Sequence, residues 1–235
     1  MGQGAKDMMV ITRLYPENAS VNLWDPILSG LKNCIVKGIT PLYVSQRDDR
    51  SFTSIVSETE TPDAVVELLD CNELKLRAIR RSRTIVLAKP MFFPTPPSGK
   101  KMRRYHFSIH VKLAEVRGVH QTLRKAKPTP DAGLAYLACA FGEEELVGSL
   151  VASDYDRAKA FLMENIGNLA SVMGFTISRV GYSKRLVNDK TWKAIINKYP
   201  HAATDAIAKA KDMDWTLVEN ALITGAFKGE LGPGC

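Results

Sequence analysis

The sequence contains no apolar run of about 18 residues, the length that a membrane-spanning helix needs. It also lacks the N-terminal pattern of a secretory signal peptide, a basic stretch followed by an apolar one. Its four cysteines, Cys34, Cys71, Cys139 and Cys235, form no CxxC pair, so neither a disulfide framework nor a structural zinc site is indicated. These absences predict a cytoplasmic protein with buried, reduced thiols.

Recognisable catalytic motifs are missing as well. There is no P-loop, no GxGxxG after a predicted strand, no GxSxG and no HExxH. His106 and His110 share the polar face of a predicted strand and could bind a metal or shuttle protons, but no third ligand has a position that points to them. We therefore expect no catalytic residue, no metal and no cofactor.

The composition is that of a folded chain. Hydrophobic residues make up 45% and charged residues 24% of the 235 residues, which are ordinary values for a globular protein and far from those of a disordered one. Single domains most often contain about 100 to 150 residues, so this length suits two small domains.

The first half of the chain alternates between two hydrophobic periods. An N-cap residue followed by proline and by apolar residues at helical spacing predicts a helix, and a period of two predicts a strand. One helix is expected to begin at Asp25 and to end before Gly38, and another to begin at Thr61. The predicted order is strand, helix, strand, strand, helix, strand, with the strands at 8–15, 41–46, 51–58 and 74–88.

The same order repeats in the second half. Residues 90–101 hold four prolines and a glycine, which disfavour regular structure. We therefore expect a linker over residues 94–102. Beyond it, helices are predicted at 117–126 and from Asp154 to a stop at Gly174. The strands of this half are expected at 105–113, 134–141, 146–152 and 175–182.

Two such units predict an α+β fold of two tandem ferredoxin-like (βαββαβ) units with antiparallel sheets, followed by a C-terminal helical segment. The expected boundaries are 1–93 for the first unit, 94–102 for the linker, 103–186 for the second unit and 187–235 for the helical tail. The order resembles that of RNA-recognition modules, of tandem-domain CRISPR RNA-processing proteins and of the ligand-sensing domains of Lrp-type and ACT-type regulators. This resemblance is one of element order and assigns no role to any residue.

Charge is distributed unevenly along the chain. Residues 75–127 contain fifteen Lys or Arg and a single acid, Glu115, which gives +14. Because the whole chain carries +7, the remainder carries −7. Such segregation favours a polyanionic partner, of which nucleic acid is the commonest, although many charge runs only solvate a surface.

We therefore predict a non-enzymatic nucleic-acid-binding protein, with RNA favoured over DNA, that forms a homo-oligomer. Its phosphate-binding residues are expected to converge on one basic surface. The candidates are Arg80, Arg81, Arg83, Lys100, Lys101, Arg103, Arg104, Lys112, Arg124, Lys125 and Lys127.

Two alternatives stay open at this point. One is a regulatory or scaffold oligomer, for example one that resembles a viral matrix protein. It would bind an acidic protein, an anionic membrane surface or a small ligand. The other is a metal-independent RNA endonuclease with His106 or His110 as general base.

Overall fold

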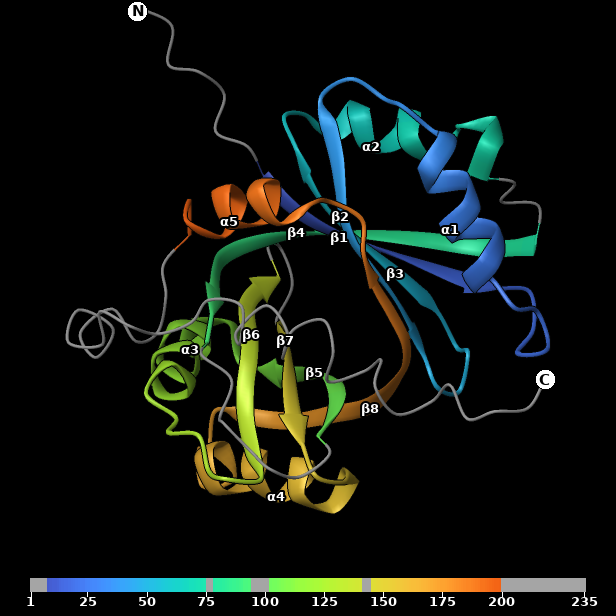
Figure 1. The fold of residues 1–235 in the computed structure, drawn as a ribbon. Helices are drawn as coiled ribbons and strands as arrows, with labels where there is room; N and C mark the ends of the chain where they lie inside the picture. Colours follow the sequence, from blue (N-terminus) through green and yellow to red (C-terminus); the bar gives the residue numbers. More distant parts are fainter. Residues whose placement is uncertain (1–7, 75–77, 94–101, 141–144, 200–235) are drawn as a thin grey trace, which may run out of the picture. The chain divides into compact units, whose positions relative to one another are not determined.

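The computed structural model describes residues 8–74, 78–93, 102–140 and 145–199 (Figure 1). Within these ranges there are eight strands and five α-helices, and every strand pair with a defined register is antiparallel. The predicted α+β class with antiparallel pairing is confirmed. None of the helices in these ranges has the length and apolar character needed to cross a bilayer.

Contacts divide the chain into two units. Unit 1 comprises Met1–Leu87 and Gly181–Lys193, and unit 2 comprises Ala88–Val180 and Ala194–Cys235. Strands β4 (Ile79–Phe92) and β8 (Val172–Arg185) each contribute residues to both units.

Unit 1 is an antiparallel sheet with the strand order β4-β1-β3-β2. Its helices α1 and α2 lie on one side of the strands (Figure 1). Along β1, Val10 and Leu14 are buried and pack with Ile27 of α1 and Leu68 of α2 in one hydrophobic core. The elements are β1 (Met8–Pro16), α1 (Trp24–Asn33), β2 (Ile39–Arg47), β3 (Thr53–Thr59), α2 (Pro62–Leu69) and the 3-10 turn η1 (Asn72–Leu74).

Unit 2 has the corresponding order β8-β5-β7-β6. Tyr105, Phe107 and Ile109 of β5 alternate into its core, as the period of two predicts, and meet Leu123 of α3 and Phe161 of α4. The elements are β5 (Arg103–Val111), the 3-10 turn η3 (Leu113–Glu115), α3 (Val116–Arg124), β6 (Ala132–Ala140), β7 (Glu145–Ala152) and α4 (Tyr155–Ile166). A fifth helix, α5 (Asp189–Ile196), follows β8.

Several element ends differ from the sequence-based expectation. Helix α1 ends at Asn33 because Cys34 already has extended backbone angles, and Gly38 supplies a left-handed turn (φ +80°) just before β2. Strand β4 continues through Pro90 to Phe92, into the stretch expected to be irregular. Strand β8 begins at Val172, so Gly174 lies inside a strand and does not end a helix. Residues 94–101 of the predicted linker (94–102) and residues 200–235 of the predicted tail (187–235) lie outside the described residues.

The prediction of reduced thiols is wrong for two of the cysteines. Cys34 and Cys71 are joined by a disulfide, with their Cα atoms 6.3 Å apart. They are separated by 37 positions in the sequence, so no local spacing pattern pointed to the pair. Cys139 on β6 is a free thiol.

Candidate functional site

Unit 2 contains a cavity of about 540 Å³ between helix α3 and the neighbouring strands. This volume suits a small organic molecule, since ligand pockets commonly measure roughly 300 to 1,000 Å³. Its wall is formed by the end of β4, by η3, by one face of α3 and by one residue of β6. The lining residues are Ala88, Lys89, Met91, Ala114, Val116, Arg117, His120, Gln121, Arg124 and Cys139.

Helix α3 supplies the polar groups of this wall. Arg117, His120, Gln121 and Arg124 are spaced at three and four residues, which places them along one side of the helix. Val119 and Leu123, which are buried, belong to the hydrophobic core of unit 2. The amphipathic pattern of α3 therefore anchors the helix and turns a basic, histidine-containing face toward the cavity.

His120 is the most unusual of these residues. It is only 6% exposed, and its Nε2 atom is buried with no hydrogen-bond partner. Burial lowers the pKa of its imidazole below the usual value of 6.5, and the positive charges of Lys89 and Arg124 act in the same direction. The ring is therefore neutral at pH 7.

The tautomer of His120 follows from its second contact. The imidazole hydrogen-bonds to the backbone of Lys89, and this bond works against the lowering of the pKa. A bond with that effect is one in which the ring donates to a carbonyl. Because Nε2 has no partner, the donor is Nδ1, and Nε2 carries the lone pair of the neutral ring.

Lys89 holds its carbonyl in place with an uncommon backbone conformation. Its φ is +51°, in the left-handed region that a residue with a Cβ adopts at a cost. Strained backbone of this kind is found more often where a functional group has to be positioned. Here it occurs at the residue that orients His120.

The rest of the wall combines apolar surface with positive charge. Burial raises the pKa of the Cys139 thiol, so this residue is a neutral, weakly polar part of the wall. Lys89, Arg117 and Arg124 are exposed and are among the residues that line the cavity. The cavity wall therefore combines apolar surface, exposed cationic residues and a neutral histidine.

The structure places the predicted phosphate-binding residues at separate positions. Arg80 and Arg81 are exposed and Arg83 is half-buried on the unit 1 part of β4, where the Arg81 guanidinium lies 4.2 Å from the centre of the Tyr15 ring. Lys125 and Lys127 are exposed just after α3, and Arg124 is the one candidate that lines the cavity. Lys100 and Lys101 lie outside the described residues.

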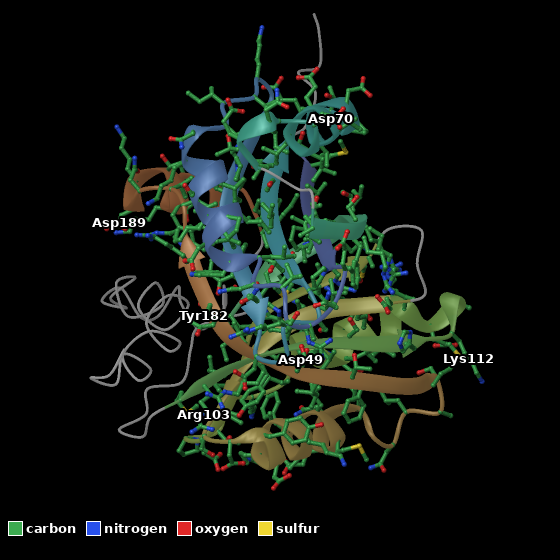
Figure 2. All side chains as sticks on the ribbon, turned by 90° about the vertical axis from the view of Figure 1, so that its right-hand side faces the viewer. Asp49, Asp70, Arg103, Lys112, Tyr182 and Asp189 are labelled. Atoms are coloured by element: carbon green, nitrogen blue, oxygen red, sulfur yellow. A yellow bond between two sulfur atoms is a disulfide. The ribbon has the colours of Figure 1, made fainter. Side chains whose placement is uncertain are left out.

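The candidates on β5 and directly after it lie far apart or are buried. Arg103 is the first residue of β5 and Lys112 follows its last residue (Figure 2 labels both), which corresponds to a separation of roughly 30 Å at about 3.3 Å per residue. Arg104 is only 3% exposed and cannot reach a phosphate group from the protein surface. His110 pairs with Glu145 (Nδ1 to Oε1, 3.5 Å), and in the described residues no metal-ligand cluster includes His106 or His110.

Sequence reasoning missed His120, Lys89 and Arg117. The spacing of Arg117, His120 and Arg124 over two helical turns was a usable signal, but the helical pattern of 117–126 is weak. The lack of a hydrogen-bond partner for Nε2 of His120 and the backbone conformation of Lys89 both depend on packing between elements that are distant in the sequence.

The chain therefore has a mixed α+β fold with a cavity in unit 2. No family model and no curated protein matches the sequence. Among solved structures, the chain is similar to an anthrone oxidase-like protein (11% identity, TM-score 0.50, covering 78% of this chain and 94% of that one). It is also similar to a protein of Lactobacillus acidophilus assigned as a monooxygenase (12%, 0.47, 78% and 99%) and to a variant of chlorite dismutase from Candidatus Nitrospira defluvii (11%, 0.44, 77% and 93%). At these identities the likeness concerns the fold alone.

These findings correct the functional prediction. The expectation of a non-enzymatic nucleic-acid-binding protein is corrected, because the fold is similar to that of an anthrone oxidase-like protein. The buried position of Arg104 and the separation of Arg103 from Lys112 agree with this correction.

Proposed function

We propose that the chain is an enzyme that binds a small, mainly apolar organic molecule in the unit 2 cavity and removes a proton from it with His120. The observation that carries this proposal is that His120 lines a cavity of about 540 Å³ while its Nε2 atom is buried with no hydrogen-bond partner. A neutral imidazole with one fixed nitrogen and one free nitrogen is suited to general-base catalysis.

The residues of the wall have separate roles in this step. Nε2 accepts the proton from a weakly acidic C–H or O–H group of the substrate, and the Lys89 carbonyl stabilises the resulting imidazolium through Nδ1–H. Arg117 and Arg124 stabilise the negative charge that develops on the substrate. Met91 and Val116 provide apolar contacts for the body of the substrate.

The fold shared with the anthrone oxidase-like protein supports oxidation as the overall reaction. Molecular oxygen would be the oxidant. A deprotonated CH₂ group gives its electrons to O₂, so that R₂CH₂ and O₂ yield R₂C=O and H₂O.

The test uses anthrone and a set of simple phenols as probes. Oxygen uptake and the rise in melting temperature are measured for the wild type, for His120→Gln and for His110→Gln, which alters an exposed histidine of the same unit. We expect His120→Gln to lower turnover by about 10² to 10⁴-fold and to keep the ligand-induced rise in melting temperature, with His110→Gln unchanged. Equal turnover in both variants would refute the assignment of the base.

Three further predictions belong to this proposal. The matching orders β4-β1-β3-β2 and β8-β5-β7-β6 support two ferredoxin-like units, which we assign to 1–93 and 103–186 with the linker between them. We also expect a cytoplasmic location and a homo-oligomer. Light scattering on the purified chain checks the oligomeric state.

A further inference from the structure

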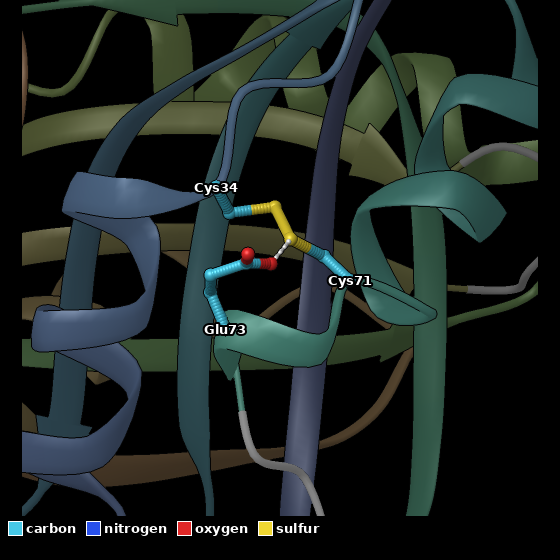
Figure 3. Close-up of side chains that lie close together, drawn as sticks. All are labelled: Cys34, Cys71 and Glu73. Carbon is cyan, nitrogen blue, oxygen red and sulfur yellow. Dashed lines mark hydrogen bonds between the residues drawn. A yellow bond between two sulfur atoms is a disulfide. The ribbon is translucent and has the colours of Figure 1, made fainter.

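Unit 1 contains a second group of reactive side chains, separate from the His120 cavity. Sγ of Cys34, Sγ of Cys71 and a carboxylate oxygen of Glu73 all lie within 4.8 Å of one another. Figure 3 shows these three side chains pointing toward one another. Cys34 is buried, Cys71 is half-buried and Glu73 is exposed, so the group opens to solvent on one side.

The fold brings the three residues together through a close contact between α1 and η1. Cys34 caps the C-terminus of α1, where its N–H donates to the Gly30 carbonyl (2.9 Å). Gly30 has no Cβ, and a Cβ at this position would lie 2.5 Å from the carbonyl oxygen of Glu73 and 2.7 Å from Cα of Leu74. Glycine is therefore required for η1 to approach α1, and this approach fixes the spacing of Cys34 and Glu73.

The surroundings of the group favour a cation. Cys34 lies at the C-terminus of α1, and the Cys71 N–H donates to the Leu68 carbonyl (3.4 Å) at the C-terminus of α2. Helix C-termini carry partial negative charge and attract positive ions. The Glu73 carboxylate adds a full negative charge at the same place.

The contact between Cys71 and Glu73 is not a hydrogen bond when Cys71 is in the disulfide. Sγ of Cys71 lies 2.9 Å from Oε2 of Glu73. A disulfide sulfur carries no hydrogen, so an ionised carboxylate gains no hydrogen bond from it. The same arrangement is favourable when Cys71 is a thiol that donates its S–H, or when both atoms coordinate one cation.

We infer that Cys34, Cys71 and Glu73 form a site for a thiophilic divalent cation of the Zn²⁺ class when the cysteines are reduced. Two thiolates and one carboxylate match the ligands that Zn²⁺ prefers, and three protein ligands leave a fourth, tetrahedral position for water. Tetrahedral coordination at about 2.3 Å places the two sulfurs about 3.8 Å apart, which side-chain rotation can provide at a Cα separation of 6.3 Å.

The disulfide is the metal-free form of this site. A dithiol reductant opens it by thiol–disulfide exchange, which yields two protein thiols and the oxidised, cyclic reductant. The cation then binds both sulfurs and releases two protons. Oxidation by a small-molecule disulfide reverses the sequence and expels the cation.

The experiment compares the two redox forms of one protein. The full chain is reduced with a dithiol, desalted without oxygen and titrated with Co²⁺, whose thiolate complexes have a characteristic charge-transfer absorption; Zn²⁺ is then added as a competitor. We expect one Co²⁺ per reduced chain, displacement by Zn²⁺ and no such absorption in the oxidised chain. Because both forms have the same sequence, this comparison does not depend on the folding of any variant.

Single substitutions assign the ligands. Cys34→Ser and Cys71→Ser should each remove the thiolate absorption of a two-sulfur site, and Glu73→Gln should weaken binding at least about tenfold. The controls Cys139→Ser and Cys235→Ser should bind as the wild type does. The inference is overturned if the reduced wild type shows no thiolate absorption, if the oxidised form binds equally well, or if Cys34→Ser binds like the controls.

Discussion

The protonation state of His120 links one buried side chain to the pH dependence of the proposed reaction. Its pKa is lowered below 6.5 by burial first, so the neutral, proton-accepting form predominates at pH 7. We expect kcat/KM to be constant near neutrality and to fall only as the pH drops below 6.5. A pH–rate profile with its acid limb above pH 7 would contradict this assignment.

The backbone of Lys89 gives a second prediction at the residue scale. Valine tolerates a φ of +51° poorly, and glycine tolerates it without strain. Lys89→Val should therefore lower the free energy of unfolding by about 1 to 3 kcal/mol, and Lys89→Gly should leave it unchanged or raise it by up to about 1 kcal/mol. Urea denaturation measures both values, and an equal loss in both variants would show that the lysine side chain matters more than the backbone angle.

At the scale of elements, the packing of β7 between its neighbours depends on a glycine. A Cβ at Gly148 would lie 2.4 Å from Cζ of Phe107 on β5 and 2.4 Å from the Tyr136 carbonyl oxygen on β6. Gly148→Ala should therefore cost about 1 to 3 kcal/mol of unfolding free energy. Gly174→Ala is the matched control, because no atom lies within 4 Å of its added Cβ, and it should change stability by less than about 0.5 kcal/mol. Thermal unfolding of the two variants distinguishes them.

Elements with a clear period could be predicted from the sequence, and contacts between elements could not. Tyr105, Phe107 and Ile109 alternate with polar residues and are buried, so the sequence alone located β5 and its core face. Formal charge could be counted from the sequence, but the direction of each side chain could not, and Arg104 is buried.

The candidate site was beyond prediction for the same reason. His120 acquires its properties from the carbonyl of Lys89, thirty-one positions earlier, and from the strands that bury it. The pair of Cys34 and Cys71 likewise depends on the packing of α1 against η1. Neither the contact of His120 with Lys89 nor that of Cys34 with Cys71 leaves a periodic or regularly spaced pattern in the sequence.

At the scale of the whole molecule, unit 1 is built from two separate stretches of the chain. Residues 181–193 complete it: the Leu186 N–H donates to the Leu42 carbonyl of β2 (2.9 Å), and the Tyr182 ring lies 5.6 Å from that of Trp24 (Figure 2 labels Tyr182). A chain that ends at residue 180 should therefore exchange its β2 amide hydrogens faster than a chain that ends at residue 193.

Hydrogen exchange followed by mass spectrometry tests this prediction peptide by peptide. The amides of β5 and β7 belong to unit 2 and serve as the internal reference, since their pairing is present in both truncated chains. Identical exchange in the β2 peptides of the two chains would mean that 181–193 contributes nothing to the stability of unit 1.

The divided composition of unit 1 also determines when it can be completed during synthesis. A ribosome that adds about 5 to 20 residues per second needs roughly 5 to 20 seconds to pass from residue 88 to residue 180, and only then does the last stretch of unit 1 follow. Strands β1 to β3 leave the exit tunnel long before their final neighbour in the chain exists. The nascent N-terminal half therefore stays incomplete until the second half has been synthesised, and chaperones can bind it during this time.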